Sequence, residues 1–568
     1  MDPSAVPVGC RVVDAEGFKA TVRYVGPVKG AKNPDEIWFG VEWDNPTRGK
    51  HDGTSVDNAG VIHVYFACAG GAGSFIRPAK VSFGRAFLAA LEERYVDMDA
   101  PSIAEGEGTI PNVFVNTLKG NQIGIQFVGE ENIRKRQQVC NVSVVTIRGD
   151  TISSIPPGSC STASHLVEID LQDNLLWRWE DVSTLGSEIP GLGVLLLHGN
   201  RLQPITESVA ASLNPACFAC LRVLALNACG IKSWASVQLL EPFLPVVEEL
   251  YLSGNLLSDL PLPLSPQEQY ESAPTPTAPL CVGFPALRLL DISDCGLCEW
   301  TQVAVFGGLR LQECILDGNP LPAVRPPAEG AFSCLARFSL ANTGIASWLD
   351  VNELAAYPTL RVLRLSQIPL FVGRGSSEVR PEAIARIKQL EFFNGSGISP
   401  RERVEAEKNY LRALHYQRAA VAKAAASAAG SASTPAPATA EGIDLALHPR
   451  YPELIERYGA DLIPVSKASS GPSNMAAELI SVTFRNLSFI SGGTLEPVTK
   501  RLPKSLAISR LQLMVKAIFG LDPRLQQLSL RVHKDAPPTV MDDVEATLQY
   551  YGAEDGADIF INEAKDQG

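Results

Sequence analysis

The chain has 568 residues, of which 45% are hydrophobic and 20% charged, a globular composition too long for a single core and consistent with roughly three to four domains. Its formal net charge of −13 argues against a general nucleic-acid binder. No stretch approaches the roughly 20 consecutive apolar residues of a membrane span, and MDPSAVPVGCRVVDAEG lacks the basic start and apolar run of a secretory signal. We therefore expect a cytosolic protein.

Residues 1–95 contain short β-rich runs separated by glycine, proline and asparagine, such as KATVRYVG, IWFGVEW and GSFIRPAKV. This pattern predicts a small curled antiparallel sheet or β-barrel, with FGRAFLAALEERYVD as a connecting helix. The region holds 11 Lys/Arg and 11 Asp/Glu, so the rest of the chain carries the whole negative charge. An acidic ligand is therefore repelled least here. We expect residues 96–110 to form a joint.

A glycine-flanked lysine turn, TRGKHDG, follows the second aromatic run. A nucleotide-binding loop would need glycine at position 44 and Ser or Thr at position 51, where the chain has Asp44 and His51. Glycines allow close approach of a ligand backbone, and a lysine attracts a carboxylate. The candidate binding residues are Gly49, Lys50, His51, Asp52 and Gly53, with an aromatic slot from Phe39, Trp43, Phe66 and Phe75. Alternatively, these aromatic residues fill the barrel core.

The pattern L-x-x-L-x-L-x-x-[NCT] recurs between residues 111 and 425, mostly at intervals of 24 to 29 residues, as in leucine-rich repeats. Its copies are LVEIDLQDN, LGVLLLHGN, LRVLALNAC, VEELYLSGN, LRLLDISDC, LQECILDGN and LARFSLANT, with weaker copies from Val142, Leu360 and Ile387. The side chains at positions 4 and 6 lie on one face of the strand, and the polar side chain at position 9 can hydrogen-bond to neighbouring backbone groups where the strand ends. We therefore predict an α/β solenoid over residues 111–425, closed by a terminal helix within 399–430.

The central outward position of these repeats carries a mixture that suits a protein surface better than a small ligand. It reads Asp170, Leu196, Ala225, Tyr251, Asp291, Ile315, Ser339 and Arg364. The candidate protein-binding residues on this face are Asp170, Tyr251, Asp291 and Arg364. One interval is longer because residues 261–280 are inserted, and we expect a surface loop there, either a tolerated insertion or a partner-binding segment.

Two cysteine pairs, Cys217/Cys220 and Cys295/Cys298, have the C-x-x-C spacing of a zinc site. Cys229 and Cys295 also occupy position 9 of their repeats, which favours a structural role. We therefore predict no metal site.

Residues 426–475 have the composition of a linker, with one short helix at 448–459. Residues 476–568 contain the strand-like runs ELISVTFRN, LQQLSLRV and GADIFINE around the helical run ISRLQLMVKAIFG. Ser509 is the expected helix N-cap and Gly520 the stop. This order predicts an α+β ubiquitin-like β-grasp.

GVEWDNPTRGKHDG followed by GSFIRPAKV resembles the CAP-Gly family, a microtubule-associated module with a G-K-N-D-G signature. The resemblance implies that residues 49–53 and the aromatic slot bind an acidic C-terminal peptide ending in an aromatic residue, as on α-tubulin. His51 stands where most of the family has Asn, which predicts a different peptide affinity or specificity.

The order CAP-Gly, leucine-rich repeats and ubiquitin-like domain resembles the tubulin-folding cofactor E family over nearly the whole chain. The resemblance implies a cytoplasmic, cytoskeleton-associated chaperone. Its implied partners are α-tubulin, the α/β-tubulin dimer, whose assembly and dissociation it serves, and other tubulin-folding cofactors. We find no catalytic motif, so we expect no enzyme and no cofactor, and any GTP hydrolysis would occur on tubulin. We also expect no nucleic-acid or membrane partner.

Two alternatives remain for the function. One is a CAP-Gly microtubule-associated adaptor, and the other, less favoured, is a ubiquitin-pathway component. The ubiquitin-like domain is a candidate contact for the proteasome or ubiquitin machinery.

Overall fold

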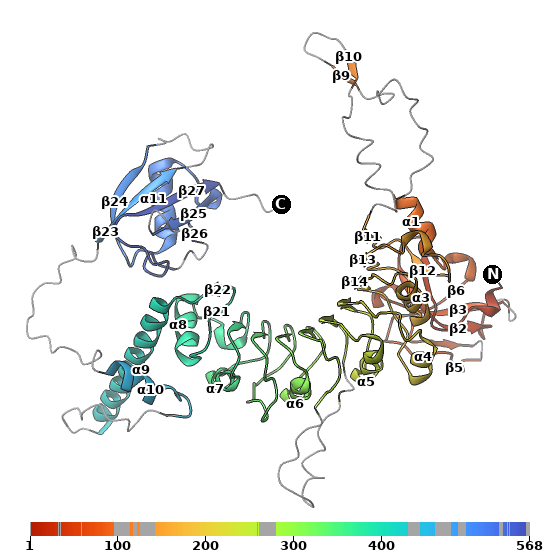
Figure 1. The fold of residues 1–568 in the computed structure, drawn as a ribbon, viewed down its shortest axis with the longest axis horizontal. Coiled ribbons are helices and arrows are strands. Elements are labelled where there is room, and N and C mark those ends of the chain that lie inside the picture. Colours follow the sequence, from red (N-terminus) through yellow and green to blue (C-terminus); the bar gives the residue numbers. More distant parts are fainter. Residues whose placement is uncertain are drawn as a thin grey trace, which may run out of the picture. The chain divides into compact units, whose positions relative to one another are not determined.

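A computed structural model describes residues 2–31, 33, 36–57, 59–95, 114–116, 122–124, 142–257, 260, 280–429, 444–459, 479–486, 496–532, 538–541, 544 and 546–563 (Figure 1). The chain divides into two compact units. The first comprises Met1–Ala346 and Ala356–Ile368, and the second Ser347–Ala355 and Pro369–Gly568. Among the described helices, none combines the length and apolar character that crossing a membrane requires.

The N-terminal region is a small antiparallel barrel, as predicted. Its five-stranded sheet runs in the order β6 (Gly73–Ile76), β3 (Trp38–Trp43), β2 (Lys19–Gly26), β1 (Arg11–Asp14) and β7 (Val81–Ser82). A separate hairpin pairs β4 (Thr54–Val56) with β5 (Ile62–Val64), and single 3₁₀ turns lie at Pro3–Ala5, Pro46–Arg48 and Pro78–Lys80. The alternating apolar residues of β1, β2 and β3 share one buried core.

The predicted connecting helix is α1 (Phe87–Tyr95), preceded by the short strand β8 (Arg85–Ala86). β8 pairs in parallel with β12 (Ile152–Ser154), and Arg85 forms a 2.5 Å ion pair with Asp150. Phe87, Ala90 and Leu91 of α1 are buried. The connector is thus anchored to the start of the repeats. The predicted joint at 96–110 lies outside the described residues, as do residues 111–141 except for the antiparallel pair β9 (Phe114–Asn116) and β10 (Gln122–Gly124).

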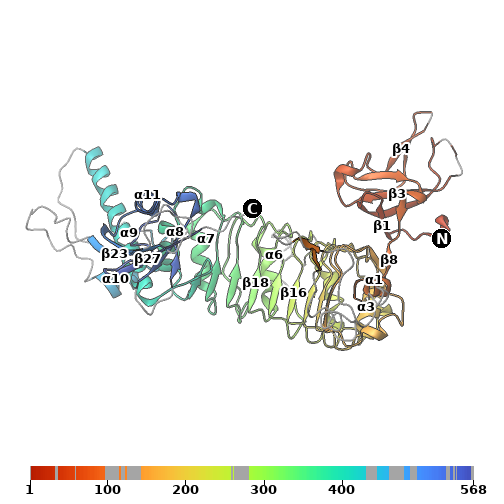
Figure 2. The same cartoon turned by 90° about the horizontal axis from the view of Figure 1, so that it is seen from above.

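The repeats form a parallel sheet with one strand per repeat, which confirms the leucine-rich solenoid (Figure 2). The strands are β11 (Val144–Thr146), β13 (Glu168–Asp170), β14 (Val194–Leu196), β15 (Val223–Ala225), β16 (Glu249–Tyr251), β17 (Leu289–Asp291), β18 (Glu313–Ile315), β19 (Arg337–Ser339) and β20 (Val362–Arg364). Their middle residues, leucine in most strands, pair in register and are buried.

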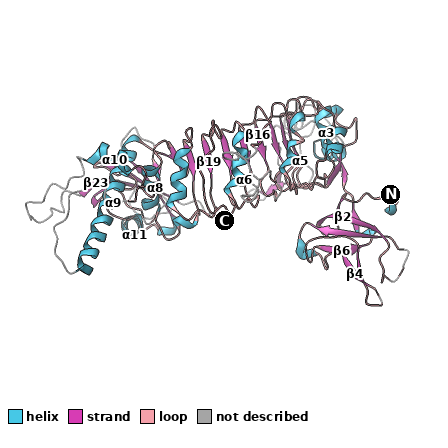
Figure 3. Cartoon of the chain, turned by 90° about the horizontal axis from the view of Figure 1, so that it is seen from below, coloured by secondary structure: helices cyan, strands magenta, loops and turns pink. Residues whose placement is uncertain are grey.

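Short helices follow many of these strands on the opposite side of the repeat (Figure 3). They are α3 (Trp179–Glu188), α4 (Glu207–Ser212), α5 (Trp234–Gln238), α6 (Trp300–Ala304) and α7 (Trp348–Glu353), with 3₁₀ turns at Ser161–Ala163, Glu241–Phe243, Val305–Gly308, Leu354–Ala356 and Pro369–Phe371. Most of these helices begin with a buried tryptophan, which fills the space between neighbouring repeats.

In six of the seven strong repeats, the side chain at position 9 hydrogen-bonds to a carbonyl of the preceding repeat, as predicted, whereas Thr343 bonds the Leu340 carbonyl of its own repeat. Asn255 is fully buried; its side-chain Nδ2 donates to the carbonyls of Leu226 (2.8 Å) and Leu252 (2.7 Å), and its Oδ1 accepts from the Ile231 N–H (3.0 Å). The equivalent residues Asn174, Asn200 and Asn319 make matching bonds. Cys229 and Cys295 belong to the same series, because their thiols donate to the Leu197 and Leu252 carbonyls at 3.3 Å. Their structural role is therefore confirmed.

The terminal cap consists of α8 (Ser376–Arg386), the hairpin β21 (Phe392–Phe393) and β22 (Ser396–Gly397), and the long helix α9 (Pro400–Ala429). The short predicted helix is α10 (Tyr451–Tyr458). The structure differs from the expected linker at residues 444–459, because α10 packs its apolar face against α9. Of the predicted insertion at 261–280, residues 261–279 lie outside the described residues, as do residues 430–443 and 460–478.

The C-terminal domain is a β-grasp with strands in the order β24 (Val498–Pro503), β23 (Leu479–Asn486), β27 (Ala557–Glu563), β25 (Gln526–Arg531) and β26 (Thr539–Val540). The helix α11 (Ile508–Phe519) packs on this sheet, and a 3₁₀ turn follows at Pro523–Leu525. Gly520 ends α11 at φ 75°, as expected. The expected N-cap is wrong: α11 begins at Ile508 after Ala507, so Ser509 lies inside the helix.

Candidate functional site: an aromatic cluster in the N-terminal barrel

The two faces of β3 have different neighbours, and this decides which aromatic residues are available to a ligand. Phe39, Val41 and Trp43 alternate along the strand and lie in the barrel core, with Phe39 fully buried and Trp43 6% exposed. Phe39 packs edge-on against Phe83, at 6.0 Å between ring centroids. The structure therefore places Phe39 and Trp43 in the core and not in a slot, which is the alternative left open by the sequence.

Gly40 alternates with Phe39 and Val41 and therefore lies on the opposite face of β3. On that face, Phe66 and Phe75 belong to an aromatic cluster with Tyr24 and Tyr65. Ring centroids are 4.9 Å apart for Tyr24 and Tyr65, 5.2 Å for Tyr65 and Phe75, and 5.8 Å for Phe66 and Phe75. Gly40 makes room for this cluster, because a Cβ there would lie 2.5 Å from Cε1 of Phe66.

Sequence reasoning missed Tyr24 and Tyr65. The register shift between Val22 and Tyr24 in the β2–β3 pairing changes which residues share a face, and a pattern of plain alternation does not reveal it.

The Gly-Lys turn is held beside this cluster by backbone hydrogen bonds to β6. The N–H groups of Lys50 and His51 donate to the Gly73 carbonyl at 2.7 and 3.1 Å, and the Gly73 N–H donates to the His51 carbonyl at 2.7 Å. Both flanking glycines are required by geometry. Gly53 has φ +98°, and an added Cβ at Gly49 would overlap the Gly71 carbonyl.

Lys50 is exposed at the tip of the turn. Within the described part of the chain, its ammonium has no hydrogen-bond or ion-pair partner, so it is available to an anion. Asp52 has a different role: its carboxylate accepts from the hydroxyl (2.7 Å) and N–H (3.3 Å) of Thr54, which lowers the pKa of Asp52 and stabilises the turn. The motif thus combines one available cation with an acidic residue that is used internally.

His51 joins the turn to the aromatic cluster. Its ring stacks on Phe75, with 4.7 Å between centroids and 28° between planes, and its Nδ1 accepts from the Gly53 N–H at 3.0 Å. A neutral imidazole that accepts at Nδ1 carries its proton on Nε2. Burial lowers the pKa of His51 by more than the nearby Asp52 charge raises it. At neutral pH, His51 is therefore an uncharged hydrogen-bond donor through Nε2.

These residues together form a surface suited to an acidic chain end. The cluster offers aromatic faces, Lys50 offers a positive charge, and His51 offers a neutral donor. No group of three or more His, Cys, Asp or Glu side chains in the described ranges is arranged to hold a metal ion. In the C-x-x-C pairs, Cys217 and Cys295 are buried whereas Cys220 and Cys298 are exposed.

Three of the four candidate residues on the predicted solenoid face lie at the surface, namely Tyr251, Asp291 and Arg364. Tyr251 donates to Glu249 at 2.7 Å, and burial together with this carboxylate raises the pKa of Tyr251. Asp291 accepts from Ser293, and the exposed Arg364 lies 3.5 Å from Asp317.

Asp170 differs from the other three because it is only 1% exposed and is paired with Arg148 in the neighbouring strand's turn. The structure places it outside the available surface. Sequence reasoning did not select Glu249, Glu313 and Arg337, which occupy the first outward position of their strands.

Comparisons with known proteins agree with this architecture. The CAP-Gly domain family matches residues 8–81 and the ubiquitin-like domain family residues 487–567. Tubulin-specific chaperone E of Danio rerio is 30% identical over 568 residues, with 98% of each chain covered. Tubulin-folding cofactor E of Arabidopsis thaliana is 28% identical, covering 96% of this chain and 95% of that protein.

Solved structures match single parts of the chain. The C-terminal ubiquitin-like domain of mouse tubulin-specific chaperone E is 16% identical with a TM-score of 0.14, covering 18% of this chain and 98% of that one. Internalin C2 of Listeria monocytogenes is 14% identical with a TM-score of 0.26, covering 55% of this chain and 92% of that one.

Proposed function

The chain belongs to the tubulin-specific chaperone E family, and from that premise we propose that it is a tubulin-folding chaperone. It binds α-tubulin and acts with other tubulin cofactors in the assembly and dissociation of the α/β-tubulin heterodimer. It works in the cytoplasm, in association with the cytoskeleton. It acts by binding, and any GTP hydrolysis in the cycle takes place on tubulin.

The observation that carries the proposal is the unpaired Lys50 beside the aromatic cluster of Tyr24, Tyr65, Phe66 and Phe75. An acidic tail ending in an aromatic residue complements both features. Its carboxylates accept hydrogen bonds from the Lys50 ammonium and from Nε2–H of His51, and its terminal ring lies against the cluster. Hydrogen bonds to charged groups contribute about 1.5–3 kcal/mol each, and an aromatic pair adds about 0.5–1.5 kcal/mol.

A single site of this kind binds a tail but does not by itself distinguish a folding subunit from any other tubulin. We propose that the solenoid face around Tyr251, Asp291 and Arg364 contacts the folded body of tubulin. Tethering the two contacts on one chain makes the second binding event intramolecular, which strengthens two weak contacts without any new one.

The test is the affinity of the full-length chain for a fluorescent acidic peptide ending in tyrosine. Lys50→Ala combined with His51→Ala removes the cation and the donor, and we expect binding at least tenfold weaker by anisotropy. Lys80→Ala, an exposed lysine elsewhere on the barrel, is the matched control and should bind as the wild type does. Unchanged affinity in the double variant would move the tail site away from this cluster.

A second candidate is favoured by the CAP-Gly match alone: an adaptor that docks on microtubules through the same site. The two functions differ in the form of tubulin retained. The chaperone should capture unpolymerised tubulin or cofactor complexes from extract, whereas the adaptor should sediment with polymer. A contact of the ubiquitin-like domain with the proteasome or ubiquitin machinery is compatible with either function, and loss of that contact on deleting residues 476–568 would demonstrate it.

A further inference from the structure

Residues 444–459 are joined to the solenoid cap by an extensive set of contacts, although they follow α9 only after residues 430–443. The apolar side of α10 carries Tyr451, Leu454 and Tyr458, all buried. These side chains pack against Ala385 of α8 and against Tyr410, Leu411 and Leu414 of α9. The segment thus covers an apolar groove that α8 and α9 form together.

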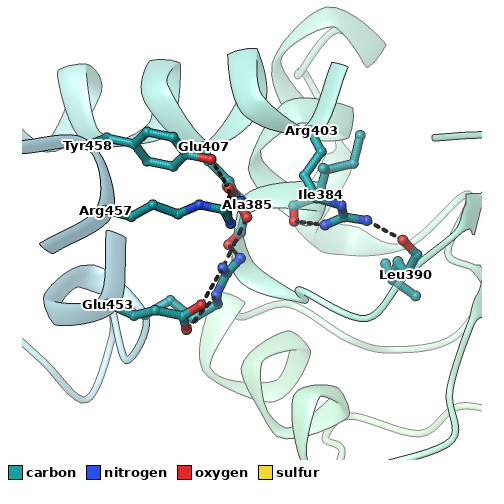
Figure 4. A network of polar contacts seen from close by, with 9 residues as sticks. Ile384, Ala385, Leu390, Arg403, Glu407, Glu453, Arg457 and Tyr458 are labelled. Carbon is teal, nitrogen blue, oxygen red and sulfur yellow. Dashed lines mark hydrogen bonds and ion pairs between the residues drawn. The ribbon is translucent and has the colours of Figure 1, made fainter. Parts of the chain in front are cut away.

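At the centre of the contact, a buried carboxylate of α9 is satisfied by residues of the docked segment. Glu407 is 1% exposed. Its Oε1 accepts from Nη2 of Arg450 at 2.9 Å, its Oε2 accepts from the Tyr458 hydroxyl at 2.8 Å, and Arg457 lies 3.7 Å from Oε2 (Figure 4). A buried charge is strongly unfavourable without such partners. Glu407 is therefore placed to receive this segment.

The remaining polar contacts fix the path of the chain into the groove. The Leu447 carbonyl accepts from Nη1 of Arg386 (2.7 Å) and from Nδ2 of Asn352 (3.0 Å). The hydroxyl of Tyr410 lies 2.7 Å from Nδ1 of His448. Arg450 also donates to the Ala385 carbonyl, in the last turn of α8. Both the backbone and the side chains of the segment are thus recognised.

We propose that the α8–α9 groove is a docking site for an amphipathic helix bearing an arginine and two tyrosines, and that residues 444–459 occupy it in cis as a clasp. The buried Glu407 selects the arginine, and the apolar surface selects Tyr451 and Leu454. The clasp goes beyond tubulin binding, because none of its contacts involves the aromatic cluster of the barrel or the solenoid face.

The clasp determines how long a stretch of chain connects the solenoid cap to the C-terminal domain. With the clasp closed, only residues 460–478 connect the cap to β23; with it open, residues 430–478 do. At roughly 3.3–3.6 Å per residue, the greatest span falls from about 170 Å to about 65 Å on closing. A closed clasp therefore shortens the greatest distance that the chain allows between the cap and the C-terminal domain, and an open one lengthens it.

The experiment uses the full-length chain and hydrogen exchange measured by mass spectrometry. Arg450→Ala removes the central partner of Glu407, and we expect exchange in residues 451–458 to become at least tenfold faster, together with an increase in the maximum dimension measured by small-angle scattering. Glu453→Gln is the matched control, since Glu453 also contacts Arg450 but its side chain is 47% exposed. It should leave the exchange rate of residues 451–458 within twofold of the wild type and the maximum dimension unchanged.

Tyr458→Phe keeps the test decisive if Arg450→Ala does not fold, because it removes only the hydroxyl that donates to Glu407. We expect a smaller but measurable loss of protection, about threefold or more, confined to residues 444–459. The proposal is overturned if this segment in the wild type exchanges as fast as an unprotected peptide. It is equally overturned if the folded Arg450 or Tyr458 variants retain wild-type protection.

Discussion

Replacing Gly40 by alanine tests whether the packing of the aromatic cluster depends on the absence of a side chain at Gly40. An added Cβ would lie 2.5 Å from Cε1 of Phe66 and 2.9 Å from Cβ of Tyr24. Both distances are well inside the optimal separation of about 3.5–4.0 Å between carbon atoms, so the cluster must shift. Gly40 is not among the glycines with positive φ, so the strain comes from packing and not from the backbone.

Overpacking of this kind costs about 1–3 kcal/mol, which corresponds to a 5- to 150-fold change at about 1.4 kcal/mol per factor of ten. Hydrogen exchange of β2 and β3 in the full-length chain should therefore become faster by roughly that factor. Because Phe66 packs against Phe75 at 5.8 Å, the displacement reaches the stacked His51 as well. If the displaced cluster loses about 1 kcal/mol of its packing with the peptide, the lower end of the overpacking range, binding of the acidic peptide should weaken by at least about fivefold.

The control for this experiment is Gly70→Ala, where an added Cβ meets nothing within 4 Å. It should leave both exchange and peptide affinity unchanged. If Gly40→Ala also leaves both within twofold of the wild type, the cluster does not pack over Gly40, and its geometry is refuted.

Two further predictions concern His51 and the repeats. Because burial lowers the folded-state pKa of His51 below its unfolded value of about 6.5, its contribution to stability is complete above pH 6.5 and is lost as pH falls from there through the lower folded-state pKa. His51→Asn should therefore flatten the acid side of the barrel's stability curve, and an NMR titration giving a His51 pKa above 6.5 would contradict this. Asn255→Ala leaves the Leu226 carbonyl and the Ile231 N–H without their partner, whereas the Leu252 carbonyl keeps the Cys295 thiol, and should destabilise the solenoid by roughly 2–6 kcal/mol in urea unfolding. Cys298→Ala, at an exposed position, should change it by less than about 0.5 kcal/mol.

The sequence predicted those parts of the fold in which a local pattern repeats. Apolar residues at positions 4 and 6 and a polar residue or cysteine at position 9 recur along the repeats. Because successive repeats have the same backbone geometry, the structural role of Cys229 and Cys295 could be predicted from their position in the repeat. The glycine turn at 49–53 could also be predicted from the sequence, because few other structures require these residue types at this spacing.

What the sequence did not predict depends on contacts between distant segments. Tyr24 joins the aromatic cluster because of the register shift in the β2–β3 pairing, and a register shift is not visible in composition. Asp170 is buried because Arg148 of the preceding repeat covers it. The docking of Tyr458 onto Glu407 joins residues 51 positions apart, and no local periodicity encodes it.

The pairing of β16 with β17 shows that the register of the solenoid sheet does not depend on the length of chain between two strands. Leu250 pairs with Leu290 in the same register as in neighbouring repeats, and the Leu252 N–H donates to the Asp291 carbonyl at 2.7 Å, although the intervening segment is longer than elsewhere. We therefore expect a circular permutant with new chain termini between residues 260 and 280 to keep this pairing.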